Sequence, residues 1–129
     1  MSIADIYDKD GNPITMEQFT ELKFGGDMEY HRVGSDDIGP YWVSTVWLGM
    51  DHNFFGHGPP LIFETMVFLS AERDDPEHHG LREFDTHRWS TLEEAQKGHQ
   101  DVCTLVRATY QGELDYEAER AENGHDSPK

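Results

Sequence analysis

Apolar side chains gather in two runs near the middle of this chain, at residues 41–50 and 61–69, on either side of a loop at 51–60. The first run is rich in aromatic and β-branched residues, which favour a strand. The second run is largely apolar at both odd and even positions, which is typical of a strand covered on both faces. Because the connecting loop is short, we expect the two strands to pair antiparallel.

Apolar positions spaced three or four apart predict two helices. The short one covers residues 15–23, and Thr15 with Gln18 has the spacing of a capping box. The long one covers about 92–110 and is expected to stop at Gly112. Its apolar stripe comprises Leu92, Ala95, His99, Val102, Cys103, Val106 and Tyr110. We interpret Cys103 as a small buried hydrophobe rather than a reactive thiol.

Two further strand candidates lie at 28–33 and 81–89, each beside a loop rich in turn residues or charges, at 34–40 and 71–80. The expected fold is α+β: a small antiparallel β-sheet of three to four strands, one long C-terminal helix packed on it, and a short N-terminal helix. We expect one globular domain at 1–112, followed by an acidic tail at 113–129 that is frayed or disordered.

Charge narrows the classes of partner. The formal net charge is −16, with only 10 Lys and Arg residues, which argues against nucleic-acid binding through a basic patch and against anionic membranes. No apolar run reaches the roughly 18 residues that span a bilayer, and the N-terminus lacks a signal-peptide pattern, so we expect a cytoplasmic protein. One helix covers only one face of a strand that is apolar on both, so we also expect a homo-oligomer.

Ionisable groups are scarce in the apolar middle of the chain, where residues 41–70 contain only two charged side chains, Asp51 and Glu64. The loop adds histidines, glycines and phenylalanines, which can stack on a planar ligand and let the backbone approach it. We expect one site there, with His99 supplied by the long helix if that helix packs on the sheet face bearing Glu64. The candidate ligand-binding residues are Asp51, His52, Phe54, Phe55, His57, Glu64 and His99.

The chemistry of that site stays open between binding and catalysis. Imidazole and carboxylate groups suit a divalent transition metal, for which the candidate ligands are His52, His57, Glu64 and His99. The two loop histidines lack the helical spacing that fixes metal geometry, however, and the chain contains no serine elbow, P-loop or dinucleotide fingerprint. We therefore expect a binding protein without a cofactor. The alternative is a metal-dependent hydrolase.

Several short motifs follow one another along the chain: Thr-Val-Trp-Leu-Gly at 45–49, Asp-His at 51–52, Gly-Pro-Pro at 58–60, Ile-Phe-Glu-Thr-Met-Val-Phe at 62–68, Trp-Ser-Thr at 89–91, Glu-Ala at 94–95 and Gly-His at 98–99. This pattern, over about the middle half of the chain, resembles a family of small uncharacterised proteins of tailed bacteriophages and prophages. The resemblance implies a viral protein acting in the host cytoplasm, without an assigned activity. We expect an accessory, counter-defence protein that sequesters a small nucleotide-like signal or binds a host protein.

Overall fold

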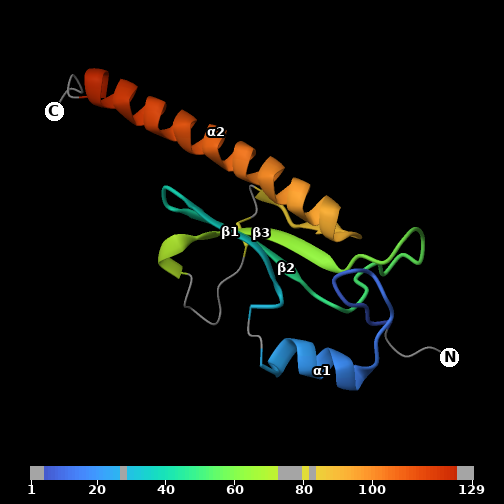
Figure 1. The fold of residues 1–129 in the computed structure, drawn as a ribbon. Helices are drawn as coiled ribbons and strands as arrows, with labels where there is room; N and C mark the ends of the chain where they lie inside the picture. Colours follow the sequence, from blue (N-terminus) through green and yellow to red (C-terminus); the bar gives the residue numbers. More distant parts are fainter. Residues whose placement is uncertain (1–4, 27–28, 73–79, 82–83, 125–129) are drawn as a thin grey trace.

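The computed structural model of the chain describes residues 5–26, 29–72, 80–81 and 84–124. Four antiparallel strands form one sheet in the order β1-β2-β3-β4, and a long helix, α2, lies along one side of it, with the short helix α1 on the other (Figure 1). The elements are α1 (Met16–Phe24), β1 (Arg32–Ile38), β2 (Tyr41–Trp47), β3 (Phe63–Leu69), a 3₁₀ turn (Ser70–Glu72), β4 (His87–Trp89) and α2 (Leu92–Gly124). The expected α+β fold is confirmed.

The first strand differs from the expectation, which placed a strand at 28–33 and a loop at 34–40. β1 instead runs through the supposed loop and pairs with β2 across a two-residue turn, because Ile38 lies opposite Tyr41. Gly39 in that turn has a φ of 56°, which glycine adopts without strain. β1 is an edge strand with largely solvated side chains, so its charged sequence is compatible with pairing.

The fourth strand is shorter than the sequence suggested. β4 pairs with β3 only from Thr65 opposite His87 to Phe63 opposite Trp89, whereas the expected strand began at residue 81. Leu81 still donates its backbone N–H to Val67 O at 2.8 Å. Residues 82–83, and most of the charged loop expected at 71–80, lie outside the described residues. In the described part of the chain, β4 therefore pairs only with the half of β3 that contains Phe63, Glu64 and Thr65.

The short helix begins as predicted. The Thr15 hydroxyl accepts from Gln18 N, and the Gln18 side chain accepts from Thr15 N, which completes the capping box. Phe19 is the one buried side chain of α1, and its ring lies 5.6 Å from that of Trp47 at the end of β2. This contact fixes the N-terminal segment against the sheet, where Ile6 also bridges to Met50.

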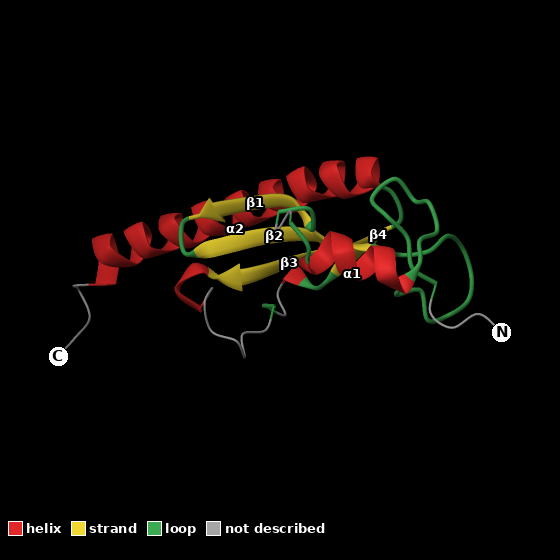
Figure 2. Ribbon diagram, turned by 60° about the horizontal axis from the view of Figure 1, so that its bottom comes forward, coloured by secondary structure: helices red, strands yellow, loops and turns green. Residues whose placement is uncertain are grey.

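The core consists of two apolar clusters with a polar band between them, and α2 contributes side chains to both clusters. One cluster contains Ile38, Tyr41, Val43, Val67, Phe84, Val102, Cys103 and Val106. The other contains Ile6, Phe19, Trp47, Ile62, Phe63 and Ala95. The buried polar side chains among the described residues are Thr45, Thr65 and His99, which lie between the clusters along β2, β3 and α2 respectively. The sheet and its covering helix are seen from another side in Figure 2.

The long helix does not stop at Gly112, and residues 113–124 of the expected tail are helical. Gly112 does not adopt the positive φ of a helix C-cap, and its neighbours are strong helix formers. The Gln111 side chain donates to Asp115 Oδ1 across the glycine at 3.0 Å. Side chains at 111–123 are all exposed, so this extension is helical without being packed. No helix among the described residues is long and apolar enough to cross a membrane.

Candidate functional site

The loop at residues 51–60, here called the aromatic loop, is held by side-chain hydrogen bonds at its base. Asp51 Oδ1 accepts from Asn53 N at 2.8 Å and from Leu61 N at 2.9 Å, so one carboxylate ties together both ends of the loop. The Asn53 side chain then donates to the carbonyl oxygens of His57 and Pro59. The backbone pair of His52 N and Leu61 O closes the base at 2.8 Å.

This bracing displays two phenylalanines at the surface. Phe54 is 76% exposed and Phe55 is 89% exposed. The His52 ring lies 5.5 Å from the Phe54 ring, and its Nδ1 hydrogen-bonds to Met50 O at 2.9 Å. His57 is exposed. The five loop residues predicted for the site therefore lie in one loop, at the surface of which Phe54, Phe55 and His57 are exposed.

The base of the aromatic loop is negatively charged. Asp51 N donates to Asp5 O at 3.1 Å, which brings the N-terminal segment alongside the loop. Partial burial and the carboxylates of Asp5 and Asp51 raise the pKa of Tyr7, because each makes the phenolate less stable. The exposed aromatic surface therefore has an acidic rim.

Glu64 does not meet His99. Neighbouring residues of a strand point to opposite faces, and Thr65 faces α2, so Glu64 faces the other side of the sheet. There its carboxylate pairs with Arg88 of β4 at 3.2 Å. A shallow pocket of about 200 Å³ on this outer face is lined by Trp42, Ser44, Val46, Glu64, Met66 and Phe68. The convergence expected among the loop histidines, Glu64 and His99 does not occur: His52 and His57 lie on the aromatic loop, Glu64 on the outer face of the sheet, and His99 in the core.

His99 lies instead in a buried chain of hydrogen bonds, which we call the polar layer. Its Nε2 lies 2.7 Å from Asp36 Oδ2 on β1, and its Nδ1 lies 2.7 Å from Thr45 Oγ1 on β2. Thr45 Oγ1 lies 2.6 Å from Thr65 Oγ1 on β3, which accepts from Trp89 Nε1 on β4 at 2.9 Å. The polar layer thus joins α2 to all four strands.

The hydrogens of the polar layer can all point the same way. A carboxylate only accepts, so a hydrogen on His99 Nε2 leaves Nδ1 as an acceptor for the Thr45 hydroxyl. Thr45 then accepts from the Thr65 hydroxyl, which accepts from Trp89. Each donor has one acceptor, which is what a buried polar group requires.

Cys103 is next to the polar layer, one turn along α2 from His99. Its Sγ lies 3.7 Å from Asp36 Oδ2, and its side chain is fully buried. Burial and the Asp36 carboxylate raise the pKa of the Cys103 thiol to about 11, although Arg107 acts in the opposite direction. One donor atom from each of Asp36, His99 and Cys103 lies within 4.8 Å of the other two. Sequence reasoning missed Asp36, because it read β1 as a loop.

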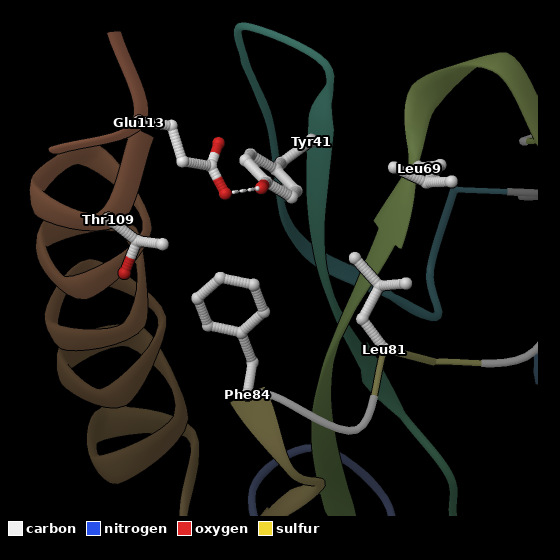
Figure 3. A pocket seen from close by; sticks show the side chains of 6 residues that line it. All are labelled: Tyr41, Leu69, Leu81, Phe84, Thr109 and Glu113. Carbon is white, nitrogen blue, oxygen red and sulfur yellow. Dashed lines mark hydrogen bonds between the residues drawn. The ribbon is translucent and has the colours of Figure 1, made fainter. Parts of the chain in front are cut away.

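A separate pocket of about 220 Å³ lies between α2 and the far half of β3, where β4 does not extend. Figure 3 shows its six lining side chains, with the Glu113 carboxylate accepting from the Tyr41 hydroxyl at 2.6 Å. The Tyr41 and Phe84 rings meet edge to face at 5.6 Å. Among the described residues that line the pocket, most side chains are apolar or aromatic, and Glu113 is the one carboxylate, which accepts from Tyr41.

Comparison of the chain with protein-family models, with curated proteins and with solved structures found no match.

Proposed function

We propose that this chain is a non-enzymatic accessory protein of a bacteriophage that binds a host protein through the aromatic loop. The observation that carries the proposal is the exposure of Phe54 and Phe55 on a loop that four side-chain hydrogen bonds hold in place. Exposed aromatic side chains on a preorganised loop are typical anchors of protein interfaces, because little conformational entropy is lost when they bind. The viral setting rests on the resemblance described above.

The partner that suits this surface has an apolar pocket surrounded by basic residues. Phe54 and Phe55 would enter the pocket, and the acidic rim around Asp5 and Asp51 would face the basic residues. The net charge of −16 would speed the encounter with such a surface, and high salt would weaken this acceleration by screening the charges. A small nucleotide-like ligand fits less well, because the loop offers an exposed tip and an acidic base to an anionic molecule.

The experiment is capture of partners from host lysate by three immobilised forms of the protein: wild type, the double variant F54A/F55A, and F24A as a matched control. Phe24 is 69% exposed on α1, so its loss removes a similar apolar surface elsewhere. One host protein retained by wild type and F24A, and released by F54A/F55A, supports the proposal. Equal retention by all three forms overturns it.

The same captured samples test the small-molecule alternative. They are denatured, and released small molecules are identified by mass spectrometry. If the samples contain a stoichiometric nucleotide-like molecule and no protein partner, the result contradicts host-protein binding and supports sequestration of that molecule. The affinity of a purified partner for wild type should fall as salt increases. Self-association stays a separate prediction, tested by light scattering, in which a clean monomer contradicts it.

A further inference from the structure

Three different metal-binding side chains converge at the edge of the polar layer. Asp36 Oδ2 lies 2.7 Å from His99 Nε2 and 3.7 Å from Cys103 Sγ. Zinc binds nitrogen and oxygen at about 2.0–2.2 Å and sulfur at about 2.3 Å, so tetrahedral ligand atoms lie about 3.3–3.7 Å apart, with the sulfur pairs at the long end. The sulfur–oxygen separation already fits this range. The nitrogen–oxygen pair has to open by about 0.6–0.9 Å.

We infer that Asp36, His99 and Cys103 form a binding site for one divalent transition metal ion, with zinc as the ion that suits the mixed thiolate, imidazole and carboxylate donors. This inference does not depend on the aromatic loop, which lies on another part of the molecule. It differs from the alternative metal site considered from the sequence, because it leaves out His52, His57 and Glu64 and retains only His99 of those four residues.

The polar layer supplies the support that a metal-binding histidine needs. A histidine that binds metal through one ring nitrogen usually donates a hydrogen bond from the other, which fixes the ring. When His99 Nε2 binds the ion, its hydrogen moves to Nδ1, and Nδ1 donates to Thr45 Oγ1. The Thr45 hydroxyl then turns toward Thr65 Oγ1, and the Thr65 hydroxyl, which donated to Thr45 before, gives up that acceptor, which is a cost of metal binding. The existing distances of 2.7 and 2.6 Å allow this reversal without movement of heavy atoms.

The site is anchored in the core and open at one end. His99 is 2% exposed and Cys103 is fully buried, whereas the Asp36 side chain is 45% exposed on edge strand β1. An ion can therefore enter along Asp36, and its fourth position can be filled by water. Three protein ligands with one open position are typical of zinc sites that bind or activate a further molecule.

Binding of the ion releases the proton of the Cys103 thiol. Thiolate is the form that binds metal, so the thiol proton leaves to solvent as the sulfur–metal bond forms. The imidazole hydrogen moves from one nitrogen to the other and is not lost.

The test uses full-length protein without an affinity tag, treated with chelator and then titrated with Co²⁺ and Zn²⁺. Co²⁺ reports its ligands by its spectrum, since a thiolate ligand gives a charge-transfer band in the near ultraviolet. The wild type should develop this band to saturation at one ion per chain, and Zn²⁺ should displace the Co²⁺. Zn²⁺ calorimetry in buffers of different ionisation enthalpy should show release of one proton per ion.

Variants separate this site from loose binding by surface acids and histidines. Cys103→Ala should lose the band, and Asp36→Asn, which replaces a carboxylate ligand by a neutral amide, should weaken Co²⁺ binding by at least the roughly 10–100-fold that loss of an outer-shell partner costs. Asp37→Asn is the matched control, because Asp37 is the next residue of β1 and points away from α2. Asp36→Asn changes a half-exposed side chain, so it tests the site even if Cys103→Ala folds poorly. Absence of the thiolate band in wild type, or equal weakening by Asp36→Asn and Asp37→Asn, overturns the inference.

Discussion

The imidazole ring of His99 lies against the backbone of Gly34, so closely that a Cβ atom at residue 34 would come within 2.8 Å of three ring atoms. Gly34 lies opposite Thr45 in the sheet, next to an irregularity in the pairing of β1 with β2. The missing side chain is what lets α2 approach the edge strand at this point. The same approach brings His99 Nε2 to Asp36, so the polar layer depends on this glycine.

Gly34→Ala is therefore expected to destabilise the fold by about 1–3 kcal/mol, the usual cost of forcing an added group into a packed site. Urea unfolding measures the change. The His99 ring is buried and hydrogen-bonded through both nitrogens, so it has no free direction in which to move. A variant as stable as wild type would mean that α2 shifts freely over β1.

Gly112→Ala is the matched control for that substitution. A Cβ atom at residue 112 would meet nothing within 4 Å, and the residue lies inside the exposed part of α2. Alanine is favoured over glycine in a helix interior by about 0.5–1 kcal/mol, so helix content should rise slightly by circular dichroism. A loss of stability in Gly34→Ala together with a gain of helix content in Gly112→Ala would separate the effect of packing from that of helix propensity.

The threonine pair at the centre of the polar layer should be sensitive to loss of a hydroxyl without loss of volume. Thr45→Val leaves His99 Nδ1 without its donor and the Thr65 hydroxyl without its acceptor, in a site closed to water. Each orphaned buried group costs about 1–3 kcal/mol, so the free energy of unfolding should fall by at least that amount. Thr65→Val should be costly as well, because it orphans Trp89 Nε1.

The double variant T45V/T65V tests whether the hydroxyls act as one unit. It leaves His99 Nδ1 and Trp89 Nε1 unpaired but removes the orphaned hydroxyl that Thr45→Val creates. Its loss of stability should therefore be smaller than the sum of the two single losses. Strict additivity in a double-mutant cycle would show that Thr45 and Thr65 do not share a hydrogen bond.

The sequence was sufficient to predict those elements whose apolar pattern is strong. β2, β3, the start of α2 and the cap at Thr15 follow directly from periodicity and capping chemistry. β1 was missed because an edge strand with solvated side chains carries charges, as a loop does. The end of α2 was misplaced because Gly112 marks a helix stop only when it adopts a left-handed conformation, which the sequence does not specify.

The candidate site was harder to predict, since it depends on which faces of the strands meet the helix. A shift of one residue exchanges the two faces of a strand. Glu64 and Thr65 therefore face opposite sides of the sheet, and the sequence-based prediction chose Glu64 instead of Thr65 as the residue on the side of His99. His99 itself was found, because it interrupts an apolar helical stripe. The Thr45–Thr65 pairing is a matter of register between strands 20 residues apart, which no local pattern reveals.

Cys103 predicts a loss of stability at alkaline pH in the metal-free protein. Its pKa in the folded state is about 11, against an ordinary value of 9.0, so between these values the folded state retains a proton that the unfolded state has lost. The stability contributed by the protonated thiol is complete below pH 9 and declines as pH rises toward 11. Urea unfolding of wild type and Cys103→Ala across this range measures the effect.

The informative quantity in that experiment is the difference in the free energy of unfolding between wild type and Cys103→Ala. The raised pKa values of Tyr7 and Tyr30 act in the same direction at high pH, but both proteins contain these tyrosines. Wild type should lose stability relative to Cys103→Ala as the pH rises through this range. A constant difference would mean that the thiol ionises as readily in the folded protein as in the unfolded chain.

Asp51 predicts that the aromatic loop can be loosened without unfolding the protein. Asp51→Ala removes the carboxylate that accepts from both Asn53 N and Leu61 N, at the two ends of the loop. Hydrogen exchange at these two amides should become about 10–100-fold faster, because each loses a bond to a charged acceptor. Binding of a protein partner should weaken as well, since the exposed phenylalanines would have to be ordered on binding.

The neighbouring N-terminal turn offers a matched control for that loop variant. Asp8 Oδ1 accepts from Asp10 N at 3.0 Å and from Asn12 N at 2.9 Å, which repeats the arrangement at Asp51 on a turn without exposed aromatic residues. Asp8→Ala should accelerate exchange locally in its own turn and leave partner binding unchanged. If both variants weaken binding equally, the effect comes from lost negative charge, which both substitutions share, and the ordered aromatic loop is not what the partner recognises.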